Sequence, residues 1–312
     1  MDAIWKQLTL KHTSAESVER GQSIQSLWSG FGEIFRAHLS PSSLGSIIVK
    51  HIAPDAGGAH PRGWGTDRST QRKMISYAVE SRWYREWSPL LAKNPKCRIP
   101  VCLGVVEDGN QRWILLEDLD AVGFAHRRGR LGVDAARVCV RWLANFHGTF
   151  LGATPEGLWP VGTYWHLDTR PDEFEAMRDG PLKQIAYELD ALLNGCQYQT
   201  IVHGDAKVAN FCFSQSDDKV AAVDFQYVGG GCGIRDVALF LDRCLGKSGC
   251  ELHGEKWLDF YFETLKQALG DRSYPADLDQ LVAEWRTLYP VAWTDYRRFM
   301  WGWGSASELD PY

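Results

Sequence analysis

The 312-residue sequence predicts an α+β protein in which a small antiparallel sheet with one helix precedes a larger, mostly helical region. Up to about residue 120 the apolar runs are short and separated by turn residues, whereas later segments carry apolar residues at helical spacing. A hydrophobic content of 45% over this length can fill two lobes, which we place at residues 1–119 and 120–312.

The first lobe is predicted as strands, one helix and a hairpin. "SIQSLWSGFGEIFRAHLS" indicates two strands around Gly30 and Gly32, and "GSIIVKHI" indicates a third. After a Gly/Pro-rich loop over residues 53–67, "STQRKMISYAVESRWYREW" has helical spacing behind a Ser/Thr cap. "RIPVCLGVVEDGNQRWILLEDL" then predicts a hairpin that turns at Glu-Asp-Gly-Asn.

The second lobe is predicted as a set of helices, of which "DAARVCVRWLANFHGTFLG" is the first. Two apolar islands interrupt them, "IVHGDAKVANFCF" and "KVAAVDF", and both are predicted as short strands.

Composition excludes several classes of function. The net charge is −5 with no basic field, which makes nucleic acid an unlikely partner. The eight cysteines form no C-x-x-C pair and indicate buried, reduced thiols. The N-terminal stretch lacks the apolar core of a signal peptide, and no run approaches the length of a membrane span. We therefore expect a protein of the reducing cytosol with no membrane partner.

The residues that carry chemistry lie on the two islands. His203-Gly204-Asp205 is followed by Asn210 and, nineteen residues after Asp205, by Asp224 at the end of an apolar strand. Phosphoryl transfer needs a carboxylate that accepts the hydroxyl proton of the acceptor, and a carboxylate and an amide that hold Mg²⁺ on the ATP phosphates. Asp205 fits the first role, and Asp224 and Asn210 fit the others. Lys207 could offset charge beside the γ-phosphate.

A second cation is predicted in the first lobe. Lys50 lies midway along "IIVKHI", where a lone lysine in an apolar strand is costly unless a carboxylate pairs with it. Glu80 on the following helix is the expected partner. Glu86 lies on the same helix and competes for this assignment, and Lys50 taken alone would more often be an edge-strand lysine with its ammonium in water.

These motifs resemble the protein-kinase-like superfamily, in particular its small-molecule branch of aminoglycoside phosphotransferases, choline kinases and ecdysteroid-kinase-like proteins. "HGDAKVAN" with "VDFQ" carries the resemblance, and "IIVK", "YAVESRWY" and "LLEDL" follow the family's order. The resemblance implies a bilobal fold, with ATP and Mg²⁺ as cofactors.

By this resemblance the family's functional residues fall on named positions of the chain. The phosphate-contacting lysine, the helix glutamate, the catalytic aspartate and the two metal ligands fall on Lys50, Glu80, Asp205, Asn210 and Asp224. The backbone from Glu117 to Leu119 would meet the adenine. Gly30 and Gly32 belong to a phosphate-covering loop, although Phe35 stands where protein kinases carry a third glycine.

Two departures favour a small-molecule acceptor over a protein substrate. Gly204 stands where protein kinases commonly carry an arginine before the catalytic aspartate. Only eleven residues separate Asp224 from Asp236, too few for a peptide-docking segment. Phe225-Gln226 resembles the ecdysteroid-kinase-like group and implies a hydroxyl of a small molecule as acceptor.

Several polar residues have a structural interpretation instead. We expect His203 to bond backbone beside its loop, Asp236 to cap a helix or anchor a neighbouring loop, and His147 to be a satisfied core histidine. Lys207 could simply be solvated. The aromatic C-terminal residues either line an acceptor pocket, where they could hold a cationic amine, or pack the helices together, and packing is favoured. They are Tyr289, Trp293, Tyr296, Phe299, Trp301 and Trp303.

Three functions from different classes follow. The first is an ATP- and Mg²⁺-dependent kinase that phosphorylates a hydroxyl of a small molecule. The second is a nucleotide-binding pseudokinase that serves as a scaffold, against which the complete set of Lys50, Asp205, Asn210 and Asp224 argues. The third is a dinucleotide-binding enzyme, suggested by "VGGGCG" between a strand and a helix, but the glycines do not fit G-x-G-x-x-G. The acceptor and the choice of ATP over GTP are left open.

Overall fold

The computed structural model describes residues 2–27, 30–54, 67–92, 94–270 and 277–303. The chain divides into two compact units. The first contains residues 1–93, 98–126 and 212–223, and the second contains residues 94–97, 127–211 and 224–312. The division into a nucleotide-binding lobe and an acceptor-binding lobe at residue 119 stays a prediction. Most of the predicted Gly/Pro-rich loop lies outside the described residues.

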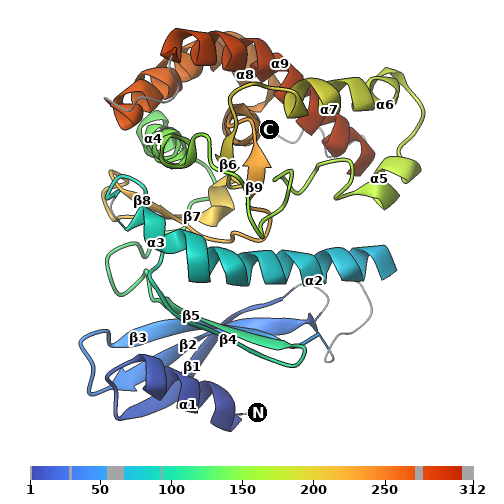
Figure 1. Cartoon of the computed structure of the whole chain (residues 1–312). Coiled ribbons are helices and arrows are strands. Elements are labelled where there is room, and N and C mark those ends of the chain that lie inside the picture. The colour runs from blue at the N-terminus through green and yellow to red at the C-terminus, as the bar shows by residue number, and fades with distance from the viewer. Residues whose placement is uncertain (1, 28–29, 55–66, 93, 271–276, 304–312) are drawn as a thin grey trace. The chain divides into compact units, whose positions relative to one another are not determined.

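The first unit is built on a five-stranded antiparallel sheet with the strand order β1-β2-β3-β5-β4 (Figure 1). Short apolar runs and the Gly109 turn produce β2, β3, β4 and β5 as predicted, whereas β1 is mostly polar and begins six residues before the predicted run. Their bounds are β1 Ser17–Ser26, β2 Gly32–Ser40, β3 Ser46–Ile52, β4 Cys102–Asp108 and β5 Gln111–Glu117.

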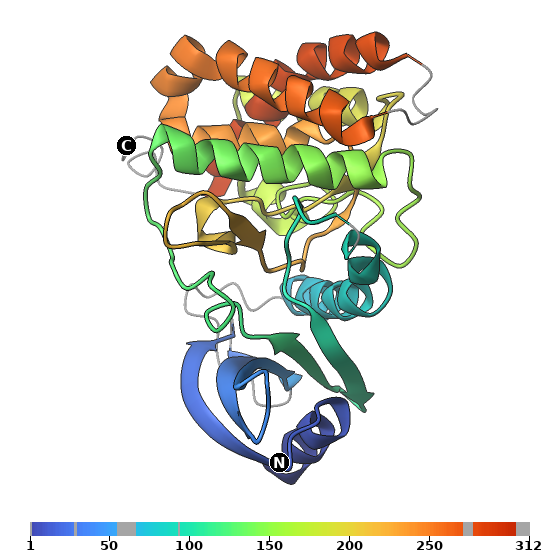
Figure 2. The ribbon, with the colours of Figure 1, turned by 90° about the vertical axis from the view of Figure 1, so that its left-hand side faces the viewer.

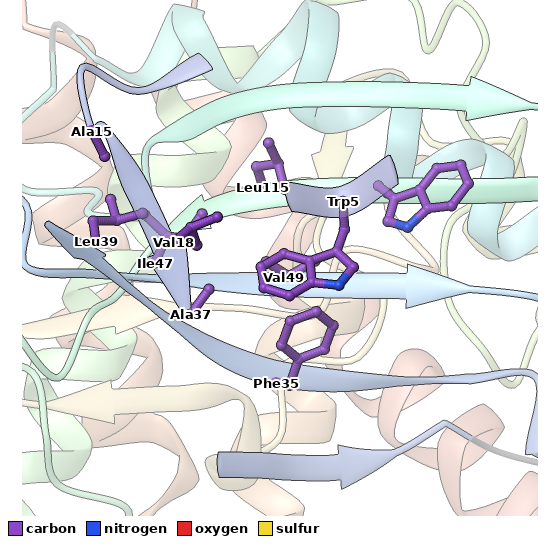
Figure 3. Close-up of a cluster of buried hydrophobic side chains, with 10 residues drawn as sticks. Trp5, Ala15, Val18, Phe35, Ala37, Leu39, Ile47, Val49 and Leu115 are labelled. Atoms are coloured by element: carbon purple, nitrogen blue, oxygen red, sulfur yellow. The ribbon is translucent and has the colours of Figure 1, made fainter. Parts of the chain in front are cut away.

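Helices pack on both faces of this sheet because side chains alternate along each strand. On one face, Trp5 of α1 (Asp2–His12) packs against Phe35 and Val49 in a buried cluster (Figure 3). On the other face, Lys50 reaches α2 (Asp67–Arg82). The sequence predicted α2 as the only helix of this lobe, so α1 is an addition. The π-helix η3 (Trp83–Trp87) and α3 (Ser88–Leu91) continue α2.

Two short strands late in the chain also belong to the first unit for most of their length. They are β7 (Phe211–Phe213) and β8 (Val220–Ala222), which pair with each other. Ala222 donates its backbone N–H to Arg98, and Phe213 exchanges backbone hydrogen bonds with His126.

The second unit is mostly helical. Figure 2 shows α4 alongside α8, and α9 packs on α8. A three-residue strand β6 pairs antiparallel with β9, an all-glycine strand that the sequence did not predict. The bounds are α4 Val133–Phe150, α5 Pro171–Ala176, α6 Pro181–Gln184, α7 Ala186–Asn194, β6 Thr200–Val202, η4 Val208–Asn210, β9 Gly229–Gly231, α8 Ile234–Leu269 and α9 Leu278–Trp303.

Two general properties of the chain bear on the earlier expectations. No helix within the described residues combines the length and the apolar character needed to cross a bilayer. All eight cysteines carry free thiols, and six of them are buried.

Candidate active site

The loop that follows β6 is shaped by a glycine. Gly204 has φ +80°, and a Cβ there would lie 2.0 Å from the backbone oxygen of Tyr227. A side chain would therefore face both an unfavourable backbone conformation and a steric clash. This close approach gives a physical reason for glycine immediately before Asp205.

Asp236 at the start of α8 anchors the same loop. Its Oδ2 accepts the backbone N–H of His203 at 2.6 Å, and its Oδ1 accepts that of Gly204 at 3.0 Å. The carboxylate is fully buried, so these bonds replace the water it has lost. The predicted structural role of Asp236 as a loop anchor is confirmed.

The two histidines near the loop are also structural. His147 donates from Nε2 to Asp236 at 3.1 Å, and its Nδ1 accepts the hydroxyl of Tyr261 at 2.7 Å. The Nδ1 of His203 accepts the backbone N–H of Asp205 at 3.3 Å. Both predictions, a satisfied core histidine and a histidine that bonds backbone beside the loop, are confirmed.

Asp205 is buried, and its two carboxylate oxygens differ. Oδ2 accepts hydrogen bonds from Lys207 Nζ at 2.8 Å and from Asn210 Nδ2 at 3.1 Å. Oδ1 is buried and has no hydrogen-bond partner among the described residues. Burial raises the pKa of Asp205 to about 6; Lys207 opposes the shift and the charge of Asp224 adds to it. One oxygen is thus left to receive a proton near neutral pH.

This pKa predicts how Asp205→Asn changes stability with pH. The folded protein holds the Asp205 proton up to about pH 6, whereas the unfolded chain releases it near pH 4. The raised pKa of the carboxyl therefore adds fully to the free energy of unfolding below about pH 4. This contribution, up to about 3 kcal/mol, is lost as the pH rises through 6. We expect Asp205→Asn to be more stable, relative to the wild type, at pH 8 than at pH 5.

Urea unfolding at the two pH values measures this difference. Asp179→Asn serves as the control because Asp179 is almost fully exposed, with 97% of its side chain accessible. A difference between the wild type and Asp205→Asn that did not change with pH would contradict the raised pKa.

Asn210 and Asp224 are the predicted metal ligands. Asn210 lies at the end of η4 and donates from Nδ2 to the backbone oxygen of Asp205 at 2.8 Å, which leaves its amide oxygen for another partner. Asp224 follows β8 and has φ +69°, a left-handed conformation that is uncommon for aspartate and frequent at functional sites. Its charge raises the pKa of both Asp205 and Lys207.

This donor set fits Mg²⁺ as it is bound in nucleotide sites. Mg²⁺ there takes one or two protein oxygens and completes its octahedron with phosphate oxygens and water. Within the described ranges, no three His, Cys, Asp or Glu residues converge as a self-sufficient metal cage. A carboxylate and an amide oxygen therefore suit a metal that arrives with phosphates.

In the first unit, Lys50 and Glu80 form a buried ion pair. Lys50 Nζ donates to Glu80 Oε2 at 2.6 Å, and both side chains are almost inaccessible. Glu86, the competing partner, pairs instead with Arg82 at 2.9 Å on the exposed side of the helix. The helical register therefore selects Glu80, because α2 turns one face toward β3.

Gly30 lies just before β2, and Gly32 is the first residue of β2. Gly32 has φ +131°, and a Cβ at this position would lie 2.0 Å from the backbone oxygen of His51 on β3. Leu27 donates its backbone N–H to the carbonyl oxygen of Gly32 at 2.8 Å. The close packing of β2 on β3 thus requires glycine at 32 for a structural reason, and a contact with phosphate stays a prediction.

Glu117 and Leu119 lie at the end of β5. The Glu117 carboxylate accepts a hydrogen bond from Arg98 Nη2 at 2.6 Å. Leu119 is buried with Cys212 and Ala221, and its carbonyl accepts the backbone N–H of Phe124 at 2.8 Å. The side chains of both residues are therefore engaged within the first unit, and a contact between this backbone segment and adenine stays a prediction.

The structure brings the predicted residues together in two groups, one in each unit. Asp205, Lys207 and Asn210 are in direct contact, with the charge of Asp224 acting on the first two. Lys50 and Glu80 form the other group. Gly30, Gly32, Glu117 and Leu119 contact neither group through any described hydrogen bond.

Two tyrosines lie beside Asp205; sequence reasoning missed Tyr164 and named Tyr296 only among the C-terminal aromatic residues. Tyr164 donates its backbone N–H to the oxygen of Gly204 at 3.0 Å, and its phenol is hydrogen-bonded to that of Tyr296. Burial and the charge of Asp205 both raise the pKa of each phenol, to about 12 for Tyr296. Tyr164 lies in an irregular loop, where no local pattern marks such a role.

The C-terminal aromatic residues have mixed environments. Tyr296 packs edge-on against Trp165 with ring centroids 5.3 Å apart, and Phe299 packs in the same way on Tyr164 at 5.4 Å. Trp293 donates to Asp242, whereas Trp301 is half exposed. The side chain of Trp303 lies outside the described residues. Tyr296 and Phe299 thus pack on the loop that carries Tyr164 and Trp165, and the hydrogen bond from Trp293 to Asp242 joins α9 to α8.

A family model, DUF1679, described as "Uncharacterized oxidoreductase dhs-27", matches residues 174–294, which is less than half of the chain. No curated protein matches the chain.

Comparison with solved structures identifies the fold. A microcompartment-associated aminopropanol kinase matches with a TM-score of 0.53 at 14% identity, over 100% of this chain and 97% of that one. The Plasmodium vivax ethanolamine kinase Pv091845 gives 0.52 at 11% identity, over 93% and 78%. The amicoumacin kinase hAmiN gives 0.50 at 14% identity, over 98% and 88%. The predicted resemblance is therefore confirmed at the level of the fold: the chain has the bilobal protein-kinase-like fold in the form seen in small-molecule kinases.

Proposed function

We propose that the protein is an ATP- and Mg²⁺-dependent phosphotransferase that phosphorylates a hydroxyl group of a small molecule. The observation that carries this proposal is the buried Asp205 carboxylate. Lys207 and Asn210 hold one of its oxygens, while the other is buried without a hydrogen-bond partner among the described residues. A carboxylate with this arrangement suits a base that positions and deprotonates a hydroxyl.

Each predicted residue has a role in this mechanism. Asp205 Oδ1 accepts the proton of the acceptor hydroxyl. The hydroxyl oxygen bonds to the γ-phosphorus of ATP as the bond between that phosphorus and the ADP oxygen breaks. Lys207 holds the carboxylate in place and offsets negative charge beside the transferred group. Asn210 and Asp224 would hold Mg²⁺, which neutralises phosphate charge when bound.

The first unit would hold the nucleotide. Lys50, oriented by Glu80, would contact the phosphates, and the turn at Gly30 and Gly32 would cover them. The backbone from Glu117 to Leu119 would meet the base. The amicoumacin kinase of the same fold was solved with AMP-PNP and Ca²⁺, which supports a nucleotide and a divalent metal as cofactors here.

A small acceptor is supported by the segment after Asp224. β9 and the start of α8 occupy residues 229–236, so little chain is left there for a peptide-docking platform. The aminopropanol and ethanolamine kinases of similar fold are named for small alcohols.

The eight free thiols support a reducing cytosol as the compartment.

The description of the matched family as an oxidoreductase raises a second candidate, a dinucleotide-binding enzyme. Such a site places glycines in the turn between a parallel strand and a helix. Here Gly229–Gly231 form β9 itself, antiparallel to β6. This geometry favours the phosphotransferase.

A coupled ADP-release assay over a panel of alcohols and aminoalcohols tests the proposal. We expect at least one alcohol to raise Mg²⁺-dependent ADP release well above the rate of ATP hydrolysis alone. Tight Mg-ATP binding without release for any alcohol would instead favour the pseudokinase alternative.

A further inference from the structure

Two cysteines of the second unit meet where the end of α7 lies beside the start of α8. Two contacts hold these segments together: Arg235 Nη2 donates to Asn194 Oδ1 at 2.7 Å, and β6 pairs with β9. Cys196 lies in sequence between Asn194 and β6, and Cys232 lies between β9 and Arg235. The two thiols are hydrogen-bonded to each other. The fold therefore joins two free thiols that are far apart in sequence.

The two thiols differ in their tendency to lose a proton. The hydrogen bond from Cys232 and the charge of Arg235 lower the pKa of Cys196, against burial and the charge of Glu284. Burial and the same hydrogen bond raise the pKa of Cys232 well above its usual range. Cys196 is thus the thiolate of the pair, and Cys232 is its hydrogen-bond donor.

The two thiols also differ in their access to solvent. Cys196 is 7% exposed and lies between two exposed residues, Gly195 and Gln197, whereas Cys232 is fully buried. A small oxidant therefore reaches the Cys196 sulfur first. The oxidised sulfur is then in contact with Cys232 on its buried side, as an attacking thiolate is with its resolving thiol.

We propose that Cys196 and Cys232 form a dithiol site that a hydroperoxide oxidises to an intramolecular disulfide. The Cys196 thiolate attacks one peroxide oxygen, the O–O bond breaks, and a sulfenic acid forms as hydroxide leaves. The Cys232 sulfur then bonds to the Cys196 sulfur, and the sulfenic oxygen leaves as water with the Cys232 proton. Two thiols are oxidised to one disulfide, and hydrogen peroxide is reduced to water.

The disulfide would close a covalent loop over residues 196–232. This stretch contains Asp205, Asn210 and Asp224 of the candidate active site. A cross-link reduces the conformational freedom of the segment that it encloses when that segment unfolds. The oxidation itself needs neither nucleotide nor acceptor, so this inference does not depend on the phosphotransferase proposal.

Peptide mapping of the full chain after peroxide treatment tests the site. The folded protein is treated with hydrogen peroxide at neutral pH, the remaining thiols are alkylated, and the peptides are measured by mass spectrometry without reduction. We expect one peptide that contains Cys196 to be linked to one that contains Cys232. Treatment with dithiothreitol should return the two free peptides.

Cys102 and Cys244 are internal controls in the same map because both are more exposed than Cys196. Burial raises the pKa of Cys102 to about 11 and that of Cys244 to about 12, so both stay protonated at neutral pH. We expect the thiols of Cys196 and Cys232 to be lost at least about tenfold faster than either control thiol.

Cys232→Ser removes the resolving thiol but keeps a hydroxyl that can donate to Cys196. Oxidation of this variant should stop at a sulfenic acid on Cys196, which dimedone labels. Cys97→Ser is the matched control, because Cys97 is also buried and its thiol donates to the backbone oxygen of Trp142 at 3.9 Å instead. The Cys97→Ser variant should form the cross-link at the wild-type rate.

The wild-type peptide map decides the inference without any variant. Faster oxidation of Cys102 or Cys244, with Cys196 and Cys232 still free, would overturn it by showing that exposure alone controls the reaction. A first cross-link between other cysteines, or a Cys196–Cys232 link that forms only after unfolding in urea, would also overturn it.

Discussion

Asp205→Asn is expected to lower turnover by about 10²- to 10⁴-fold while the dissociation constant for Mg-ATP changes by no more than about twofold. The amide keeps the shape of the side chain and can still accept hydrogen bonds from Lys207 and Asn210. It cannot take the proton of the acceptor hydroxyl. The loss should therefore appear in kcat, measured by ADP release with an acceptor from the alcohol panel, and not in nucleotide affinity measured by calorimetry.

Loss of folding does not explain this expected loss of activity. The raised pKa of the buried Asp205 carboxyl predicts that the stability of the variant relative to the wild type increases from pH 5 to pH 8, and urea unfolding at pH 8 checks that the variant is folded under the assay conditions. Asp179→Asn, at an exposed site, should keep full activity. Normal turnover by the Asp205→Asn variant would show that Asp205 is not the base.

Glu80→Met is expected to lower the free energy of unfolding by about 3–5 kcal/mol. Glu80 is the carboxylate that contacts Lys50 among the described residues, and the lysine is only 5% exposed. Removal of Glu80 leaves a buried ammonium without its counter-charge. The double variant Lys50→Met with Glu80→Met should recover most of the loss, because both charges are then replaced by apolar groups.

Urea denaturation of the four proteins of this double-mutant cycle measures the coupling between Lys50 and Glu80. Arg82→Met is the matched control, since Arg82 ends α2 and pairs with Glu86 of η3, with 47% and 40% of the two side chains accessible. That exposed pair should contribute less than about 1 kcal/mol. Additive effects of the Lys50 and Glu80 changes would show that the buried pair does not couple them.

The elements with a clear hydrophobic period were predictable from sequence. β3 and α2 were predicted because of their apolar spacing, and their positions already suggested that Lys50 pairs with Glu80. The helix α1 was missed although five of its eleven residues are apolar, because a helix this short is marginal by itself and depends on the contact of Trp5 with the sheet. β9 was missed because glycine has a low preference for strands.

The candidate site was likewise predictable only where its residues form a local sequence pattern. Asp205, Asn210 and Asp224 lie close together in sequence, so a local pattern predicted their chemistry. The contact of Tyr164 with Gly204 joins an irregular loop to the loop after β6, and it depends on tertiary packing that no local pattern encodes. Trp165 and Arg298 come from equally distant segments, and only the folded chain shows that they line one pocket.

The proposed function requires Asp224 to hold a metal-bound nucleotide. Its most direct test is a calorimetric titration with ATP, with and without Mg²⁺, of the wild type and of Asp224→Ala. The mechanism predicts that the wild type binds ATP more tightly with Mg²⁺ and that Asp224→Ala loses most of this gain. ATP affinity that is independent of Mg²⁺ in the wild type, or an unchanged gain in the variant, would contradict the assignment of the metal site.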